Sequence, residues 1–180
     1  MLIDRPKCQL LLIDMQERLL PAMAEREAAT ESCATLLTAA RHVGVPIIIS
    51  EQYPKGLGRT LPKLADLAQT NEIMEKVEFS CFANPELRAR LTGTDRAQTV
   101  IAGIEAHVCV LQTALEMAAD GRKVFVVADG VTSRKPGSKA IALQRLMAAG
   151  VEIVSTEMVL FEWLRSAEAP EFRTLSRLIR

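Results

Sequence analysis

Short apolar runs recur along the chain and are separated by segments with helical periodicity. The clearest runs cover residues 10–13, 47–49, 100–102 and 125–128, and within them polar residues do not alternate with apolar ones. A strand covered by helices on both faces is apolar on both sides, whereas a half-exposed strand alternates. These runs therefore predict a mostly parallel sheet enclosed between two helical layers.

Three glycines stand between a helical segment and a following apolar run. Gly44, Gly121 and Gly150 precede runs at residues 45–49, 124–128 and 151–154. Glycine adopts the left-handed conformation that ends many helices, so each of these places predicts a helix followed by a strand. The repeated order predicts a three-layer α/β/α sandwich with a Rossmann-like parallel sheet, formed by one domain over residues 1–180.

Other local patterns place helices and a loop. Asn84-Pro85 and Ala169-Pro170 each predict the start of a helix, because proline is favoured in a first helical turn. Residues 50–61 are rich in glycine and polar side chains and predict a loop at the rim of a site. Two predicted helical faces are Cys33, Leu36, Leu37 and Ala40, and Val108, Leu111, Leu115 and Ala118.

Charge favours a small ligand over a large anionic partner. The 180 residues include 22 lysines and arginines and 22 aspartates and glutamates, so the formal net charge is zero. A phosphate backbone or an anionic membrane surface is usually bound by an excess of basic residues. We therefore expect a small-molecule substrate, no nucleic acid and no membrane partner.

The N-terminal segment and the cysteines indicate a cytoplasmic protein. The first apolar run is too short for the core of a signal peptide or for a membrane span. Cys8, Cys33, Cys81 and Cys109 include no C-x-x-C pair. Such cysteines remain free thiols in a reducing compartment, so we expect neither disulfides nor a zinc site.

Two reactive side chains follow predicted strands at the same edge of the sheet. Asp14 comes directly after the strand at residues 10–13, and Cys109 lies in the first turn of the helix after the strand at 98–104. Ligands bind at the carboxyl edge of open parallel sheets. Lys76 follows another short apolar segment and offers a cation to this edge. A helix N-terminus and a nearby cation lower the pKa of a thiol from about 8.5, which predicts an activated Cys109.

Each of these residues also has an ordinary structural explanation. Cys109 fits a small buried apolar residue, Asp14 an N-cap for residues 15–20, and Lys76 a solvated charge among glutamates. His107 could act as the base of a Cys-His pair, or contact solvent or another subunit. Cys81 could approach the same cleft. The residues alone leave these alternatives open.

Three motifs in order resemble the signature regions of isochorismatase-like cysteine hydrolases. They are Leu-Leu-Ile-Asp-Met-Gln at residues 11–16, Lys-Val-Glu-Phe-Ser-Cys-Phe at 76–82 and Gly-Ile-Glu-Ala-His-Val-Cys-Val at 103–110. The resemblance spans roughly residues 7 to 160. It implies the strand order 3-2-1-4-5-6, a catalytic triad of Asp14, Lys76 and Cys109, and a cis peptide between Ile104 and Glu105.

The resemblance also implies a chemical mechanism. Cys109 attacks a carbonyl after Asp14 takes its proton, and backbone N–H groups of Glu105 and Cys109 form the oxyanion hole. Gln16, Phe79 and Phe82 are expected in the substrate pocket. Homo-oligomers are common in the family, and the apolar segment 161–179 could contribute to an interface.

One departure from a related group bears on metal use. Nicotinamidases of this superfamily have an Asp-x-His…His metal cluster after the second strand, whereas residues 50–58 here contain no histidine. We therefore expect no metal and no cofactor, and an amidase-like hydrolase acting on C–N bonds other than peptide bonds. The alternative is a non-catalytic oligomeric binding or scaffold protein that retains the fold.

Overall fold

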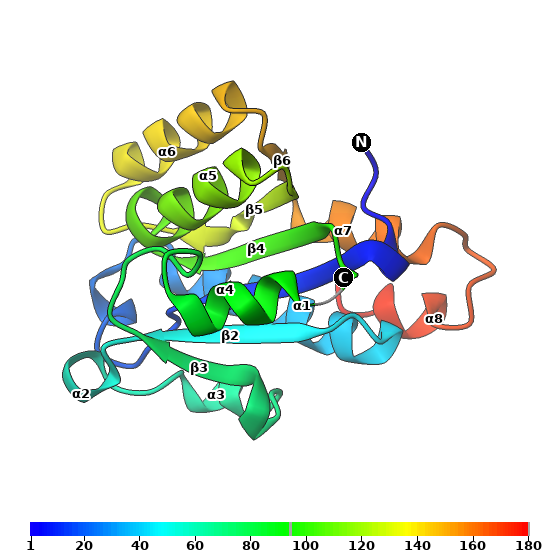
Figure 1. The fold of residues 1–180 in the computed structure, drawn as a ribbon. Helices are drawn as coiled ribbons and strands as arrows, with labels where there is room; N and C mark the ends of the chain where they lie inside the picture. The colour runs from blue at the N-terminus through cyan, green and yellow to red at the C-terminus, as the bar shows by residue number, and fades with distance from the viewer. Residues whose placement is uncertain (94, 180) are drawn as a thin grey trace.

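A parallel sheet of six strands runs through the middle of the protein in the computed structural model, which describes residues 1–93 and 95–179 (Figure 1). The strand order is β3-β2-β1-β4-β5-β6, and every neighbouring pair is parallel. The strands are β1 (Cys8–Ile13), β2 (Ile47–Gln52), β3 (Ile73–Lys76), β4 (Gln98–Ile104), β5 (Lys123–Thr132) and β6 (Glu152–Val154). The predicted sheet and its implied strand order are confirmed.

Helices cover both faces of the sheet and complete the predicted three-layer sandwich (Figure 1). One face carries α1 (Arg26–Val43), α3 (Pro62–Ala65), α7 (Thr156–Leu164) and α8 (Phe172–Leu175). The other carries α4 (Pro85–Thr92), α5 (Leu111–Ala119) and α6 (Pro136–Ala148). The shorter elements are η1 (Arg5–Lys7), η2 (Leu20–Ala22), α2 (Pro54–Leu57), η3 (Thr70–Glu72) and the π-helical turn η4 (Ala106–Val110).

Side chains along β1 alternate between these two layers. Leu10 and Leu12 pack in the core beneath α1, whereas Leu11 and Ile13 pack in the core beneath α4 and α5. Successive side chains of a strand point to opposite faces, and here both faces are buried. Full burial of one such side chain stabilises the fold by about 1.5–3 kcal/mol, which explains why the run is apolar throughout.

Glycines end three helices, as predicted. Gly44, Gly121 and Gly150 have φ values of 72°, 82° and 82°, and each lies just after a helix and before a strand. The N-terminus of α4 also follows the prediction, because the Asn84 side chain accepts a hydrogen bond from the N–H of Leu87 at 3.0 Å.

Three local predictions were wrong. Residues 50–61 do not form one loop, because β2 continues to Gln52 through its pairing with β3 and α2 follows it. The last helix begins at Phe172, not at Pro170. The stripe on α5 is displaced, since Ala114 and Met117 are buried whereas Leu115 is only partly buried. The π-helical turn before α5 breaks the 3.6-residue period on which that prediction depended.

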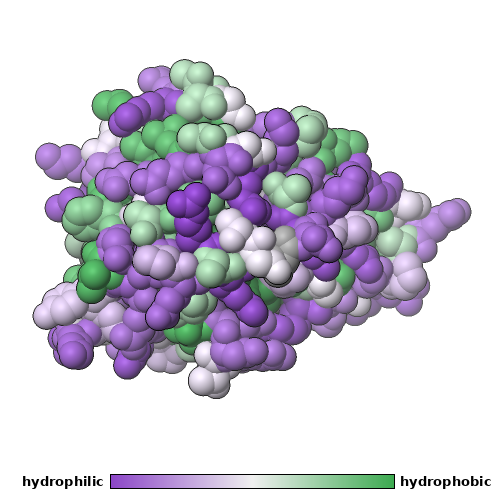
Figure 2. All heavy atoms as spheres, viewed as in Figure 1, coloured by the Kyte–Doolittle hydropathy of each residue, from purple (hydrophilic) through white to green (hydrophobic). Residues whose placement is uncertain are grey.

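Polar and charged side chains cover most of the face drawn in Figure 2, with apolar side chains between them. The exposed apolar side chains include Ile141 and Met147 of α6, which are 68% and 54% exposed. Among residues 1–93 and 95–179, no helix has both the length and the apolar character needed to cross a membrane.

Gly103 allows β1 and β4 to approach each other at the edge where the candidate site lies. It pairs with Ile13 and has a φ of 114°. A Cβ atom at this position would stand 2.1 Å from the carbonyl oxygen of Ile13 and 2.6 Å from its nitrogen. Both the backbone conformation and the available space therefore require glycine.

We expect Gly103→Ala to lower the free energy of unfolding by about 3 kcal/mol or more, because backbone strain adds to overpacking. Urea denaturation followed by circular dichroism measures this change. Gly137→Ala is the matched control, since a Cβ atom there meets nothing within 4 Å. The control should leave stability unchanged or raise it by up to about 1 kcal/mol. Equal effects of the two substitutions would contradict the steric explanation.

Candidate active site

Asp14 occupies the first position after β1 at the carboxyl edge of the sheet. Its φ is 54°, and the residue is completely buried. Its backbone N–H donates to the carbonyl oxygen of Ser50 at 3.0 Å, while its own carbonyl oxygen accepts from the N–H of Gln16 at 2.8 Å. The backbone turns sharply here, so Asp14 is not the N-cap of a helix over residues 15–20.

The carboxylate of Asp14 binds a different donor at each oxygen. The ammonium of Lys76 donates to Oδ2 at 2.7 Å, and the hydroxyl of Ser50 donates to Oδ1 at 2.7 Å. The Asp14 and Lys76 side chains are both 0% exposed. The pair is thus a buried ion pair, and Lys76 is not a solvated surface charge.

Strand pairing brings Lys76 to this edge. Lys76 is the last residue of β3 and is in register with Gln52, the last residue of β2. Its ammonium also donates to Oε1 of Gln52 at 2.7 Å. Lys76 therefore lies between two oxygen acceptors from two different strands.

Cys109 lies in the π-helical turn η4, which connects β4 to α5. The N–H of Val110 donates to the carbonyl oxygen of Glu105, five residues earlier, at 3.2 Å. Cys109 is 5% exposed, and its thiol is close enough to the carboxylate of Asp14 for each group to shift the pKa of the other. The structure thus brings Asp14, Lys76 and Cys109 together at the junction of three strands.

The charges of these groups are strongly coupled. Burial raises the pKa of Asp14, and the charge and hydrogen bond of Lys76 offset this only in part. Burial by itself lowers the pKa of Lys76, but this pKa is raised overall, and the charge of Asp14 is the largest of the opposing influences. Asp14 is consequently a stronger base than a free aspartate, and Lys76 holds its proton firmly.

The expected activation of Cys109 in the free protein was wrong. Burial is the largest influence and raises the pKa of the Cys109 thiol, and the charge of Asp14 raises it further. Lys76 opposes this shift without reversing it. The resting sulfur is therefore a thiol, and a nearby base is needed to take its proton.

Cys81 lies beside the same group of residues. Its thiol donates to Oγ of Ser50 at 3.4 Å, and its backbone N–H donates to Oγ1 of Thr113 at 2.9 Å. Burial raises the pKa of Cys81 to about 11, so the sulfur remains protonated at neutral pH. Cys81 is thus linked to Asp14 by a hydrogen bond to Ser50, and it also lies within electrostatic range of Asp14 and Lys76.

His107 and Glu105 point toward the end of β5. Nδ1 of His107 forms a hydrogen bond with the hydroxyl of Ser133 at 2.9 Å, and Glu105 accepts from Nε of Arg134 at 2.9 Å. The peptide between Ile104 and Glu105 is cis. The side chains that influence the pKa of the Cys109 thiol are Asp14, Lys76 and Cys81, and His107 is not among them, so this arrangement does not favour a Cys-His pair.

The three predicted pocket residues lie in different environments. Gln16 is completely buried, and its amide is engaged by backbone atoms of Gln52 and Gly58. Phe82 is 4% exposed in the core beneath α4, where the guanidinium of Arg88 stacks on its ring at 4.6 Å. Phe79 is 56% exposed. Gln16 therefore has a structural role, and its side chain is not a free polar group of a pocket.

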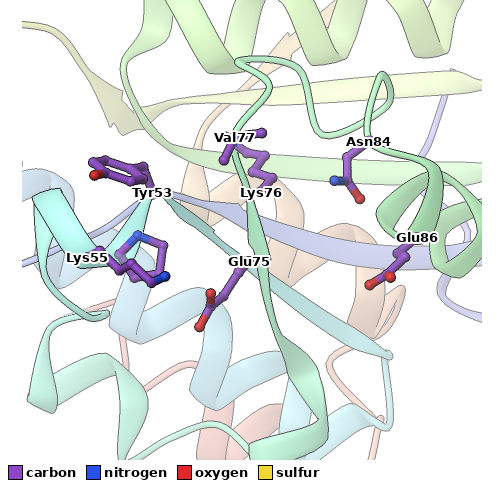
Figure 3. A pocket seen from close by; sticks show the side chains of 8 residues that line it. Tyr53, Lys55, Glu75, Lys76, Val77, Asn84 and Glu86 are labelled. Carbon is purple, nitrogen blue, oxygen red and sulfur yellow. The ribbon is translucent and has the colours of Figure 1, made fainter.

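A hollow of about 370 Å³ lies along β3 and reaches Lys76. Figure 3 shows Tyr53 and Lys55 on one side of β3, and Asn84 and Glu86 on the other. The walls of the hollow include both basic and acidic side chains, which suits a small polar molecule. Among residues 1–93 and 95–179, no group of three or more histidine, cysteine, aspartate or glutamate side chains is arranged to hold a metal ion.

Two residues in contact with the pair, Ser50 and Gln52, were missed because their polar segment was assigned to a loop. A signal was present, since residues two apart in a strand share a face. Ile48 packs in the same core as Cys109, so continuing its strand by two and four residues places Ser50 and Gln52 on that face.

Known proteins share both the sequence and the fold. The chain matches the isochorismatase domain over residues 8–158. It is 38% identical over 168 residues to isochorismatase domain-containing protein 1 of Danio rerio. The matched region covers 93% of this chain but only 59% of that relative. The MAR1 ribonuclease from Caenorhabditis elegans is 31% identical with a TM-score of 0.93, covering 99% of this chain and 92% of that one.

A more distant solved structure agrees in fold alone. The YcaC gene product from Escherichia coli, described as an octameric hydrolase of unknown specificity, has a TM-score of 0.89 at 22% identity. The likeness covers 98% of this chain and 95% of that one. Since the isochorismatase domain accounts for most of the sequence, and a relative that is 38% identical matches 93% of it, the chain belongs to the isochorismatase family.

Proposed function

We propose that the protein is a metal-independent cysteine hydrolase that cleaves a small amide or a related carbonyl compound through a thioester on Cys109. Membership of the isochorismatase family supports a hydrolase. The observation that carries the proposal is that one buried carboxylate, Asp14, binds the ammonium of Lys76 and interacts electrostatically with the thiol of Cys109. A nucleophile, its base and a cation that fixes the base are thereby adjacent.

Asp14 acts as a general base in the first step. It takes the proton from Cys109 as the sulfur attacks the carbonyl carbon, so no free thiolate accumulates in the resting protein. This order fits the raised pKa of Asp14, which results from burial, and the raised pKa of Cys109, which has the same cause. Lys76 retains its charge and stabilises the site while the proton moves.

The remaining steps return the protein to its starting state. Backbone N–H groups of Glu105 and Cys109 stabilise the oxyanion of the tetrahedral intermediate. The C–N bond then breaks, and Asp14 gives its proton to the leaving amine. Water next attacks the thioester while Asp14 takes one of its protons, and breaking the C–S bond restores the Cys109 thiol and releases the acid.

The substrate is small and is not a nucleic acid in this proposal. Cys109 is 5% exposed, so only a compact group can reach its sulfur without rearrangement. Equal numbers of acidic and basic residues also give no excess positive charge to bind phosphates. A structural relative is named a ribonuclease, so RNA belongs in the substrate screen, and we expect no cleavage of it.

The proposal includes the cytosol as the location and a homo-oligomer as the working form. All four cysteines are buried free thiols, as expected in a reducing compartment. Ile141 and Met147 expose apolar surface on α6, which a second subunit can cover. The octameric relative shows that a protein of this fold can assemble.

We expect Cys109→Ala to abolish hydrolysis in a screen of small amides followed by ammonia release, with a loss of about 10³-fold or more. Cys33→Ala is the control, because Cys33 is also buried but donates to the carbonyl oxygen of Gly130, away from Asp14. Mass spectrometry of wild-type protein quenched during turnover should find the acyl group on Cys109. Full activity of Cys109→Ala would remove the cysteine from the mechanism, and inactivity of the wild type on all amides would favour a non-catalytic role.

We expect Lys76→Met to lower the free energy of unfolding at neutral pH by about 3–5 kcal/mol, because it leaves the carboxylate of Asp14 buried without a counter-ion. Lys55→Met, at an exposed lysine, should change it by less than about 0.5 kcal/mol. Urea denaturation measures both changes. The double variant Asp14→Asn/Lys76→Met should recover part of the loss, since no buried charge remains.

The same variant has a predicted pH dependence. Without Lys76, the pKa of Asp14 in the folded protein rises further above its unfolded value, so stability falls as pH rises through that folded pKa. The deficit of Lys76→Met relative to the wild type should therefore be smaller at pH 5 than at pH 8. A deficit that is independent of pH would show that lost packing, and not an unpaired charge, causes it.

A further inference from the structure

Two polar residues of β2 face the buried ion pair. Ser50 and Gln52 are two positions apart and lie on one face, with residue exposures of 0% and 8%. Glu51, between them, points to the other face and accepts from the N–H and the hydroxyl of Thr60 at 2.6 and 2.8 Å. The end of β2 thus directs an alcohol and an amide at Asp14 and Lys76.

The hydrogen bonds of Ser50 have a defined direction. Ionised Asp14 has no proton to give, so the hydroxyl of Ser50 must donate to Oδ1 of Asp14, at 2.7 Å. A hydroxyl has one proton, and its oxygen is then left to accept from the thiol of Cys81, at 3.4 Å. The sequence of donors is therefore Cys81 to Ser50 to Asp14, and it ends on the carboxylate oxygen that Lys76 does not bind.

Both polar atoms of the Gln52 side-chain amide form hydrogen bonds. Its Oε1 accepts from the ammonium of Lys76 at 2.7 Å, and its Nε2 donates to the carbonyl oxygen of Val77 at 2.8 Å. The backbone of Gln52 is held by Gln16, which accepts from its N–H at 2.7 Å and donates to its carbonyl oxygen at 3.0 Å. Gln52 can therefore neither rotate nor flip without breaking several bonds.

We propose that Ser50 and Gln52 are positioning residues of the proposed hydrolase, with Ser50 orienting the carboxylate of Asp14 toward Cys109 and Gln52 orienting the ammonium of Lys76. The inference rests on the proposed function, because it assigns a role within that site. With Oδ1 held by Ser50 and Oδ2 by Lys76, rotation of the carboxylate is blocked. The remaining lone pairs are those available to the thiol of Cys109.

Ser50 also sets the basicity of Asp14. The titratable groups that interact with Asp14 are Lys76 from β3, Cys109 from η4 and Cys81 from the segment after β3. Lys76 and the hydroxyl of Ser50 favour the ionised carboxylate, and burial disfavours it. Removing the hydroxyl therefore raises the pH at which Asp14 becomes able to accept a proton.

The test measures the rate at which iodoacetamide alkylates Cys109 between pH 4 and 9, by mass spectrometry of the peptide that contains this residue. No substrate needs to be known. We expect the rate to rise as Asp14 ionises, and Ser50→Ala to move this rise to higher pH by roughly one unit, because a hydrogen bond to a charged group is lost. Below that pH the variant should react about tenfold more slowly than the wild type.

Two further variants separate positioning from a general structural role. Ser50→Thr keeps the hydroxyl and should restore the wild-type pH profile. Thr99→Val removes a buried hydroxyl that accepts from Gln9 near the start of β4, away from the carboxyl edge, and should leave the profile unchanged. The inference is overturned if Ser50→Ala keeps the wild-type profile, or if Thr99→Val shifts it equally.

Gln52→Met provides a second measurement that remains informative if Ser50→Ala does not fold. The Lys76 ammonium donates to the side chains of Asp14 and Gln52, and the substitution removes the second of these acceptors. We expect alkylation of Cys109 to slow several-fold with the protein still folded, and an unchanged rate overturns the role of Gln52. A failure of the proposed function gives a different result. In that case Cys109→Ala retains hydrolysis, and this outcome does not depend on how the Ser50 and Gln52 variants are alkylated.

Discussion

The buried contact between the ammonium of Lys76 and the carboxylate of Asp14 constrains the rest of the site. Removing two charges from water costs several kcal/mol for each ion, so such a pair persists only if further hydrogen bonds satisfy it. Ser50 supplies a donor to the carboxylate, and Gln52 supplies an acceptor to the ammonium. The geometry around Asp14 is consequently specified by three side chains from two strands, Ser50 and Gln52 of β2 and Lys76 of β3, and Cys109 meets a base whose orientation is already determined.

The architecture explains why these residues meet at one place. In a parallel sheet all strands end on the same edge, and β3, β2, β1 and β4 are consecutive neighbours. The central position of β1 puts Asp14 next to Ser50 on one side, while Gly103 lets β4 approach on the other. Cys109 then enters from η4, above this junction. Burial of this junction excludes water and raises the free energy of the charged groups. For the same reason, both Asp14 and Cys109 have raised pKa values.

Much of the fold could be predicted because it depends on short-range patterns. Continuous apolar runs such as residues 10–13 predicted strands buried on both faces, and Gly44, Gly121 and Gly150 predicted the helix ends. Prediction failed where pairing with a distant strand overrode local composition. The polar residues Ser50 and Gln52 belong to β2 because β3 pairs with them, and β3 lies farther along the chain than a local pattern reaches. The stripe on α5 failed similarly, because a π-helical turn changed the period.

The sequence by itself determined which reactive side chains follow which strands, since strand ends are marked by local hydrophobicity, and its three motifs identified the family. Only the tertiary structure decided their ionisation and their partners. The place of Cys109 at a helix start predicts an activated sulfur, whereas burial and the charge of Asp14 keep it a thiol. Cys81 lies near Lys76, as expected, but the structure also gives its thiol a hydrogen bond to Ser50, which in turn donates to Asp14. A pKa depends on all charges and solvent within several ångströms, and those surroundings come from segments far apart along the chain.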